Sequence, residues 1–163
     1  MADFKKIMVA AAFGQYTEGL FLYAANLATR LNTDLIVASI INERDVAAVR
    51  KIMDMGYDVD GEHYVSGIKA ERQQSLDTIL QKSGFPKNKI KTIFRVGNPV
   101  ETLLRIVLEE AVDMVVMGLK GRTNLEHVLV GSVADKMFHR SPVTVVSYRD
   151  PASVQRLQKR IQG

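Results

Sequence analysis

The chain has 163 residues, of which 47% are hydrophobic and 25% are charged, a composition typical of a globular protein with one substantial core. It contains no cysteine, which excludes disulfide bonds, thiolate metal sites and thiol nucleophiles. The formal net charge is +4, but the 22 Lys and Arg residues are scattered among 18 Asp and Glu residues. We therefore expect one domain with a mixed charged surface and no nucleic-acid partner.

The apolar stretches are too short to cross a membrane. The longest, residues 20–25 and 35–41, fall well below the roughly 20 residues that a spanning helix needs. The charged start of the chain, Asp3-Phe4-Lys5-Lys6, leads directly into a folded pattern without a cleavage site. These features predict a cytoplasmic protein with no membrane association.

Apolar runs rich in β-branched residues alternate with segments of helical spacing, a pattern typical of βαβ units. The expected strands are residues 7–11, 34–41, 92–96, 114–117 and 143–147. The intervening segments are long enough for crossover helices. The pattern therefore predicts an α/β fold: one doubly wound, five-stranded parallel sheet with helices on both faces.

The first expected helix covers residues 17–31, with Thr17 as its N-cap and Asn32 at its end. In the long connection after the second strand, residues 45–55 are expected to be helical and residues 56–61 to form a turn. A further helix is expected from about residue 65 to residue 83, closed by Gly84.

The next helix follows the turn Gly97-Asn98-Pro99, with Pro99 in its first position. Its inward positions are expected to be Val100, Leu103, Leu104, Val107 and Leu108. The continuous apolar run 114–117 that comes after it predicts a central, fully buried strand. Gly118 follows that run directly, and ligands of such folds bind beyond the carboxyl ends of the strands.

Glycines mark both ends of the segment after the fourth strand. Gly118 and Gly121 lie at its start, and Gly131-Ser132 opens a helix at its end. Glycine lets the backbone approach a phosphate closely, and a helix N-terminus adds unpaired N–H groups and partial positive charge. The alternative is structural: Ser132 and Asp135 fit a capping box, and glycines often mark turns. The segment matches neither the P-loop nor the G-x-G-x-x-G pattern.

The spacing Gly118, two residues, Gly121, nine residues, Gly131-Ser132 resembles the nucleotide-binding motif of the universal stress protein family, in its ATP-binding branch. The resemblance continues along residues 6–9, 96–99, 111–118 and 141–146. Residues 45–65 and the tail lie outside it. We therefore expect a domain over residues 1–149 and a short extension over residues 150–163. Val154, Leu157 and Ile161 indicate either an amphipathic helix or a frayed tail there.

This resemblance implies a strand order of 3-2-1-4-5, with ATP lying over the ends of strands one, two and four. Ile40 would then face the adenine. The ten residues expected around the nucleotide are Ala10, Ala12, Ile40, Met117, Gly118, Gly121, Arg122, Gly131, Ser132 and Val133. Lys120 and Arg122 are either further phosphate contacts or exposed loop cations.

One position departs from the family pattern. The family usually has Asp at the end of strand one, closely followed by Ser, where this chain has Ala12 and Gly14. A carboxylate there would accept hydrogen bonds from the nucleotide or help to hold Mg²⁺. Its absence predicts weaker or altered binding, with ATP still the favoured ligand. The sequence does not separate ATP from ADP or AMP.

Catalysis would need a base near the phosphates, and each candidate has a structural interpretation. The candidates are Glu126, His127, Asp135 and His139. The leading hypothesis is thus a regulatory nucleotide-binding protein, at most a slow ATPase. The alternative, motivated by Ala12, is a nucleotide-free homodimeric interaction module of the same fold. In either case the resemblance implies a homodimer formed through the last strand, residues 143–147.

Overall fold

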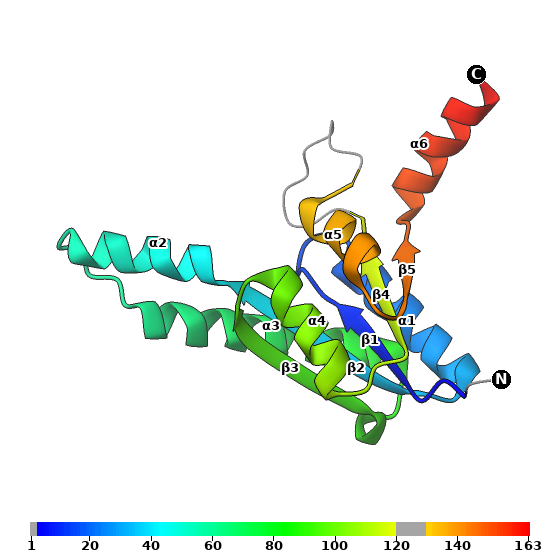
Figure 1. Cartoon of the computed structure of the whole chain (residues 1–163), viewed down its shortest axis with the longest axis horizontal. Helices are drawn as coiled ribbons and strands as arrows, with labels where there is room; N and C mark the ends of the chain where they lie inside the picture. Colours follow the sequence, from blue (N-terminus) through cyan, green and yellow to red (C-terminus); the bar gives the residue numbers. More distant parts are fainter. Residues whose placement is uncertain (1–2, 120–129) are drawn as a thin grey trace.

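Five parallel strands form one sheet in the order β3-β2-β1-β4-β5 (Figure 1). The computed structural model describes residues 3–119 and 130–163. Its strands are β1 (Lys6–Ala10), β2 (Asp34–Asn42), β3 (Ile90–Gly97), β4 (Met114–Gly118) and β5 (Thr144–Tyr148). The predicted fold class and strand order are confirmed, and each predicted strand lies within two residues of its observed bounds.

Helices cover both faces of the sheet, as the doubly wound pattern predicts. They are α1 (Thr17–Leu31), α2 (Glu43–Asp54), α3 (Gly61–Ser83), α4 (Pro99–Glu109), α5 (Ser132–Arg140) and α6 (Pro151–Gln162), with a 3-10 turn at Lys87–Lys89. Asn98 starts α4 by accepting a hydrogen bond from the backbone N–H of Glu101, and Pro99 takes the first helical position.

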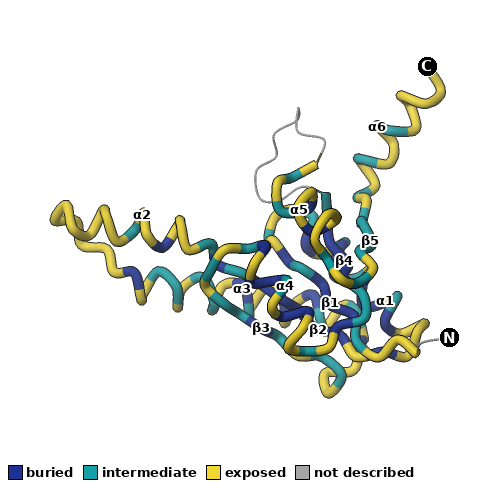
Figure 2. Tube along the Cα trace, viewed as in Figure 1, coloured by how far each residue is buried: buried dark blue, intermediate teal, exposed yellow. Residues whose placement is uncertain are grey.

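Alternate residues of β1 supply two separate apolar layers. Ile7 and Val9 lie in one buried cluster with Phe21 of α1 and Leu76 of α3. Met8 faces the opposite side, in a cluster with Ile106 of α4 and Met137 of α5. The inner strands β1, β2 and β4 are accordingly mostly buried, whereas the outer strands β3 and β5 are largely not (Figure 2). Packing on both faces holds the sheet in place, and it therefore also holds the carboxyl ends of the strands in place.

The pairing register aligns the ends of β1 and β4 with each other and with the middle of β2. Ala10 at the end of β1 lies beside Ala38 of β2 and Met117 of β4. Gly118, the last residue of β4, lies beside Tyr148 of β5. These residues stand toward the carboxyl end of the sheet, where the sequence predicts the binding site.

Three local predictions are wrong. The fourth strand is buried but not central, because β1 occupies the centre, and any interior strand carries a continuous apolar run. Leu108 is 72% exposed, since α4 turns Ile106 and Val107 toward the sheet and ends one residue after Leu108. Thr17 is not the N-cap of α1; Tyr16 takes that position, and the Thr17 hydroxyl accepts a hydrogen bond from the backbone N–H of Gly14 (2.8 Å).

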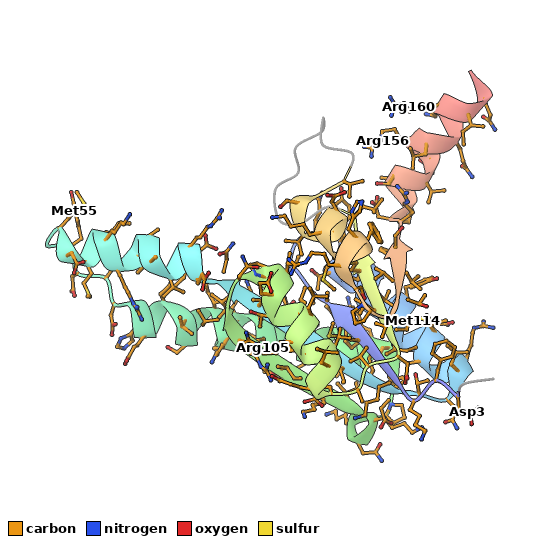
Figure 3. All side chains as sticks on the ribbon, viewed as in Figure 1. Asp3, Met55, Arg105, Met114, Arg156 and Arg160 are labelled. Atoms are coloured by element: carbon orange, nitrogen blue, oxygen red, sulfur yellow. The ribbon has the colours of Figure 1, made fainter. Side chains whose placement is uncertain are left out.

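Helix α2 and the start of α3 run side by side away from the sheet as an arm (Figures 1 and 2). Both helices begin earlier than predicted, because Asn42 and Asp60 cap them with side-chain hydrogen bonds. Met55 lies at the tip of the arm with 74% of its surface exposed (Figure 3).

The C-terminal residues form a helix rather than a frayed tail. Asp150 caps α6 by accepting a hydrogen bond from the backbone N–H of Ser153, and Pro151 occupies its first turn. None of its residues is buried, and the helix projects beyond β5 (Figure 1). Across the described residues no helix is both long and apolar enough to cross a membrane.

Candidate functional site

A cavity of about 350 Å³ opens at the carboxyl end of the sheet, where β1, β2 and β4 end. Its volume is within the range of small-molecule sites. Eight of the ten predicted site residues line it: Ala10, Ala12, Ile40, Met117, Gly118, Gly131, Ser132 and Val133. The other two, Gly121 and Arg122, lie outside the described residues. Positions separated by more than a hundred residues along the chain thus meet around one cavity.

Small apolar side chains line the β1 and β2 side of the cavity. Ala10, Ala12 and Ala38 belong to this wall, and Ile40 continues it along β2. The chain stays attached to β2 just beyond the end of β1, because the backbone N–H of Ala11 donates to the Ala38 carbonyl (3.0 Å). These residues form an apolar surface suited to a flat ring, and Asn42 and Asp45, which also line the cavity, add polar groups beyond it.

The opposite side of the cavity is the start of α5. Gly131 is the N-cap residue, with φ −68° and ψ 153°, and no side chain caps the helix. The alternative interpretation of Ser132 and Asp135 as a capping box is therefore wrong, because Ser132 is already the first helical residue. N–H groups of a first helical turn have no intrahelical partner, and together they carry about half a positive charge. This end is electrostatically suited to an anion such as a phosphate.

The candidate bases give the cavity no acid–base chemistry in the described part of the chain. Asp135 and His139 do not line the cavity. The Nδ1 atom of His139 lies 2.8 Å from the Asp135 carbonyl oxygen, and both side chains are exposed on α5. Lys120, Glu126 and His127 lie outside the described residues. In residues 3–119 and 130–163 no three His, Asp or Glu side chains come together as a metal-binding group.

The cavity also contains a buried cation. Arg72 of α3 is only 5% exposed and lines the cavity. Its Nη1 atom donates to the Ser39 hydroxyl (2.7 Å) and to the Ile40 carbonyl (3.3 Å). Its guanidinium carbon lies 5.2 Å from the centre of the Phe13 ring, a cation–π distance.

The universal stress protein family model matches residues 3–149. The chain belongs to the universal stress protein family. It is 29% identical over 161 residues to universal stress protein MJ0577 of Methanocaldococcus jannaschii, an alignment that covers 90% of this chain and 97% of the relative. Universal stress protein YxiE of Bacillus subtilis is 25% identical over 149 residues, which cover 88% of this chain and 99% of YxiE.

Solved structures of universal stress proteins share the fold. The MJ0577 structure matches with a TM-score of 0.71 at 25% identity, covering 91% of this chain and 99% of that one. UspA from Lactobacillus plantarum gives a TM-score of 0.71 at 19% identity, with coverage of 91% and 100%. A universal stress protein in complex with cAMP gives 0.65 at 20% identity, with coverage of 91% and 98%.

Several polar residues that line the cavity of this universal stress protein were not predicted from the sequence, among them Asp45, Arg72 and Tyr148. The one sequence signal for Arg72 is its helical spacing from Leu76 and Ile79. This spacing places a charged residue on a helix face where an apolar residue is expected. Tyr148 also lines the cavity, and burial raises the pKa of its hydroxyl. It packs over Gly19, where an added Cβ atom would collide with the tyrosine hydroxyl.

An ion pair joins α4 to α5. Nη1 of Arg140 lies 2.7 Å from Oε1 of Glu101, and this hydrogen bond lowers the pKa of the Glu101 carboxyl. Because Arg140 ends α5, the pair ties the far end of that helix to α4. In this universal stress protein the packing of Ala134 and Met137 in the same cluster as Leu103 holds the start of α5 beside the cavity.

A second cavity, of about 390 Å³, adjoins the first and shares Tyr16, Gly118 and Tyr148 with it. Its other wall comes from the region around α6, which supplies Arg149, Arg156 and Arg160 (Figure 3). The C-terminal helix therefore stands next to the end of β4. The division of the chain into a domain over residues 1–149 and an extension over residues 150–163 stays a prediction.

Proposed function

We propose that this universal stress protein is a regulatory nucleotide-binding protein of the stress response, located in the cytoplasm, with ATP as its ligand. The observation that carries the proposal is the meeting of the predicted residues around one cavity, with the start of α5 on one side and an apolar surface on the other. In this arrangement the N–H groups of the first turn of α5, from Ser132 onward, hold the phosphates, and Gly118 and Gly131 leave room for them beside the backbone. The N–H group of Gly131 itself donates to the Leu119 carbonyl (2.6 Å). Ile40 and the alanine wall receive the base.

Regulation rather than turnover is the role that suits these residues. A hydrolase needs a base within hydrogen-bond reach of the attacking water, and Asp135 and His139 do not line the cavity. The carboxylate that does line it, Asp45, belongs to α2 directly after β2 and not to the α5 side, where the phosphates are proposed to lie. Bound nucleotide would instead bias the conformation of α5, whose N–H groups it contacts, and so the surface that a protein partner meets. Mg²⁺ would accompany the triphosphate, with Gly121 and Arg122 as further proposed phosphate contacts.

The proposal is tested by the nucleotide that the protein carries and by the effect of added ligand. Mass spectrometry of nucleotide released from the purified chain should detect an adenine nucleotide. Millimolar MgATP should raise the melting temperature, because a ligand that binds only the folded state stabilises it. Titrations with ADP and AMP show how strongly the affinity depends on the number of phosphate groups. Inorganic sulfate at the same ionic strength is the control. No released nucleotide and no thermal shift would refute the proposal.

The second candidate function is a nucleotide-free interaction module, favoured by Ala12. The cavity wall lacks the carboxylate that the family usually places at this position. If both nucleotide measurements are negative while the protein forms a stable dimer, the module is the function that remains.

We also propose that two copies pair through β5. This strand is at the edge of the sheet, so one side of its backbone has no neighbouring strand within the described chain. Such an edge is a template for pairing with another chain, and its residues are only half buried except for the exposed Thr144. Light scattering after gel filtration should give twice the monomer mass of 18.2 kDa. A monomer mass at micromolar concentration would contradict this pairing.

A further inference from the structure

The second cavity, here called the α6 cavity, has an excess of positive charge. Its charged lining residues are Arg149, Arg156, Arg160 and Asp150. The Asp150 carboxylate is already occupied as the cap of α6: Oδ1 accepts from the Ser153 N–H (2.9 Å) and Oδ2 from the Ser153 hydroxyl (2.6 Å). The uncharged lining residues are Tyr16, Gly118, Leu119, Tyr148, Ser153 and Leu157. A cavity lined by charges mainly of one sign attracts counter-ions, here anions.

The three arginines of the α6 cavity are open to a ligand. All three are exposed, and none forms an ion pair with a carboxylate of the described residues. Arg95 and Arg140, by contrast, each pair with a glutamate. The guanidinium groups at the α6 cavity therefore keep their donors for solvent or for a bound anion.

The spacing along α6 adds to the case for an anion. Arg156 and Arg160 are four residues apart, so they lie on one face of the helix, where like charges repel each other. Figure 3 shows both side chains on the side of α6 that faces α5. The helix also contains Lys159 but no acidic residue that could offset these charges. An anion between the arginines would relieve the repulsion.

The α6 cavity continues the nucleotide cavity across the sheet. Strands β2, β1, β4 and β5 follow one another in the sheet. The base is proposed to lie at Ile40 of β2 and the phosphates at Gly118 of β4, while Tyr148 of β5 lines the α6 cavity. Strands are spaced by about 4.8 Å, so β4 is roughly 10 Å from β2 but only about 5 Å from β5. Because Gly118 lines both cavities, phosphates beside it stand at the entrance to the α6 cavity.

We propose that the α6 cavity is a second phosphate site, which receives the phosphate groups beyond the third of a nucleotide held in the first cavity. The ligand class is a nucleotide with an extended phosphate chain, either a nucleoside tetraphosphate or a dinucleoside polyphosphate. Arginine suits this role, because its planar fork binds two phosphate oxygens. Arg156 and Arg160 lie beyond residues 3–149, which the family model matches. The inference rests on the proposed function, since it takes the phosphates to lie at Gly118.

A ligand series tests the inference on the wild-type chain. Isothermal titration at constant Mg²⁺ and ionic strength compares ATP, adenosine 5′-tetraphosphate and diadenosine pentaphosphate. A longer phosphate chain should bind about tenfold more tightly than ATP, because one additional charge-assisted contact contributes about that factor. If only the tetraphosphate gains, the site accepts a free phosphate end; if diadenosine pentaphosphate gains, it also accepts a second nucleoside. The gain should shrink in about 0.5 M salt, which screens contacts to exposed arginines.

Variants of α6 test whether the arginines supply this gain. The double variant Arg156→Gln with Arg160→Gln should bring the affinity ratio between the longer ligands and ATP to about one. Glutamine is a good helix former and already occurs in α6, so the helix should persist. Arg105→Gln with Lys159→Gln is the matched control, because it removes the same charge from exposed residues that line neither cavity (Figure 3). It should keep the wild-type ratio. Circular dichroism shows whether both variants are folded.

Two results would overturn the inference while leaving the proposed function standing. The first is a wild-type chain that binds ATP but binds neither longer ligand more tightly. The second is a folded Arg156→Gln, Arg160→Gln variant whose affinity ratio matches that of the control variant, which would show that the arginines are only solvated surface charges. If neither ATP nor a longer ligand binds, the proposed function itself is refuted, and the inference falls with it.

Discussion

Replacing Gly131 by valine should lower the affinity for MgATP about a hundredfold and leave the fold intact. Gly131 stands directly before α5, where the phosphates would approach the free N–H groups of the first turn. A branched side chain there blocks that approach. Losing two hydrogen bonds to a charged group, at about 1.5 kcal/mol each, corresponds to about a hundredfold in the dissociation constant. Isothermal titration with MgATP measures the change.

The backbone at Gly131 is the reason to expect a folded variant. Its φ of −68° and ψ of 153° are in the extended region that valine adopts readily. Gly67→Val is the matched control, because Gly67 lies on α3 and an added Cβ atom there meets nothing within 4 Å. That variant should bind MgATP as the wild type does. A folded Gly131→Val variant with wild-type affinity would show that the phosphates do not use the start of α5.

The fold could be predicted from the sequence because its main signals are local. Continuous apolar runs such as 114–117 mark buried parallel strands, and Asn98-Pro99 marks the start of α4 by capping chemistry. Leu108 shows the limit of periodicity. It continues the apolar spacing of Leu104, yet it is exposed, because the last turn of α4 extends past the sheet that would cover it. Which turn of a helix still contacts the sheet depends on tertiary packing.

The candidate site also has one part that could be predicted from the sequence and one part that could not. The end proposed for the phosphates is formed by backbone at glycines whose spacing can be recognised along the sequence, so Gly118 and Gly131 were predicted. The end proposed for the base depends on contacts between residues far apart in the chain. Arg72 reaches Ser39 over 33 positions, and only the packing of α3 against the sheet places its guanidinium at the cavity. A single charged residue within an apolar stripe was the one signal, and it does not say what the charge faces.

The substitution Ala12→Asp should increase the affinity for MgATP about tenfold. Ala12 is exposed, lines the cavity, and stands where the family usually has Asp, so a carboxylate can be added without loss of packing. A hydrogen bond to a charged group contributes about 1.5 kcal/mol, which corresponds to about tenfold. Isothermal titration measures the gain. Repeating the titration with ATP in EDTA shows whether the carboxylate acts on the nucleotide directly, in which case the gain persists, or through Mg²⁺.

The same substitution bears on base selection. A carboxylate near the base accepts from the adenine amino group and repels the O6 acceptor of guanine, so Ala12→Asp should raise ATP affinity and leave GTP affinity unchanged or lower. Ala12→Asn, which keeps one acceptor oxygen without the charge, is the matched control and should give a smaller gain. If ATP and GTP tighten equally only when Mg²⁺ is present, the carboxylate holds the metal, and position 12 has no part in reading the base. If neither nucleotide tightens in Ala12→Asp, the end of β1 does not contact the ligand, and the base must lie elsewhere along the cavity.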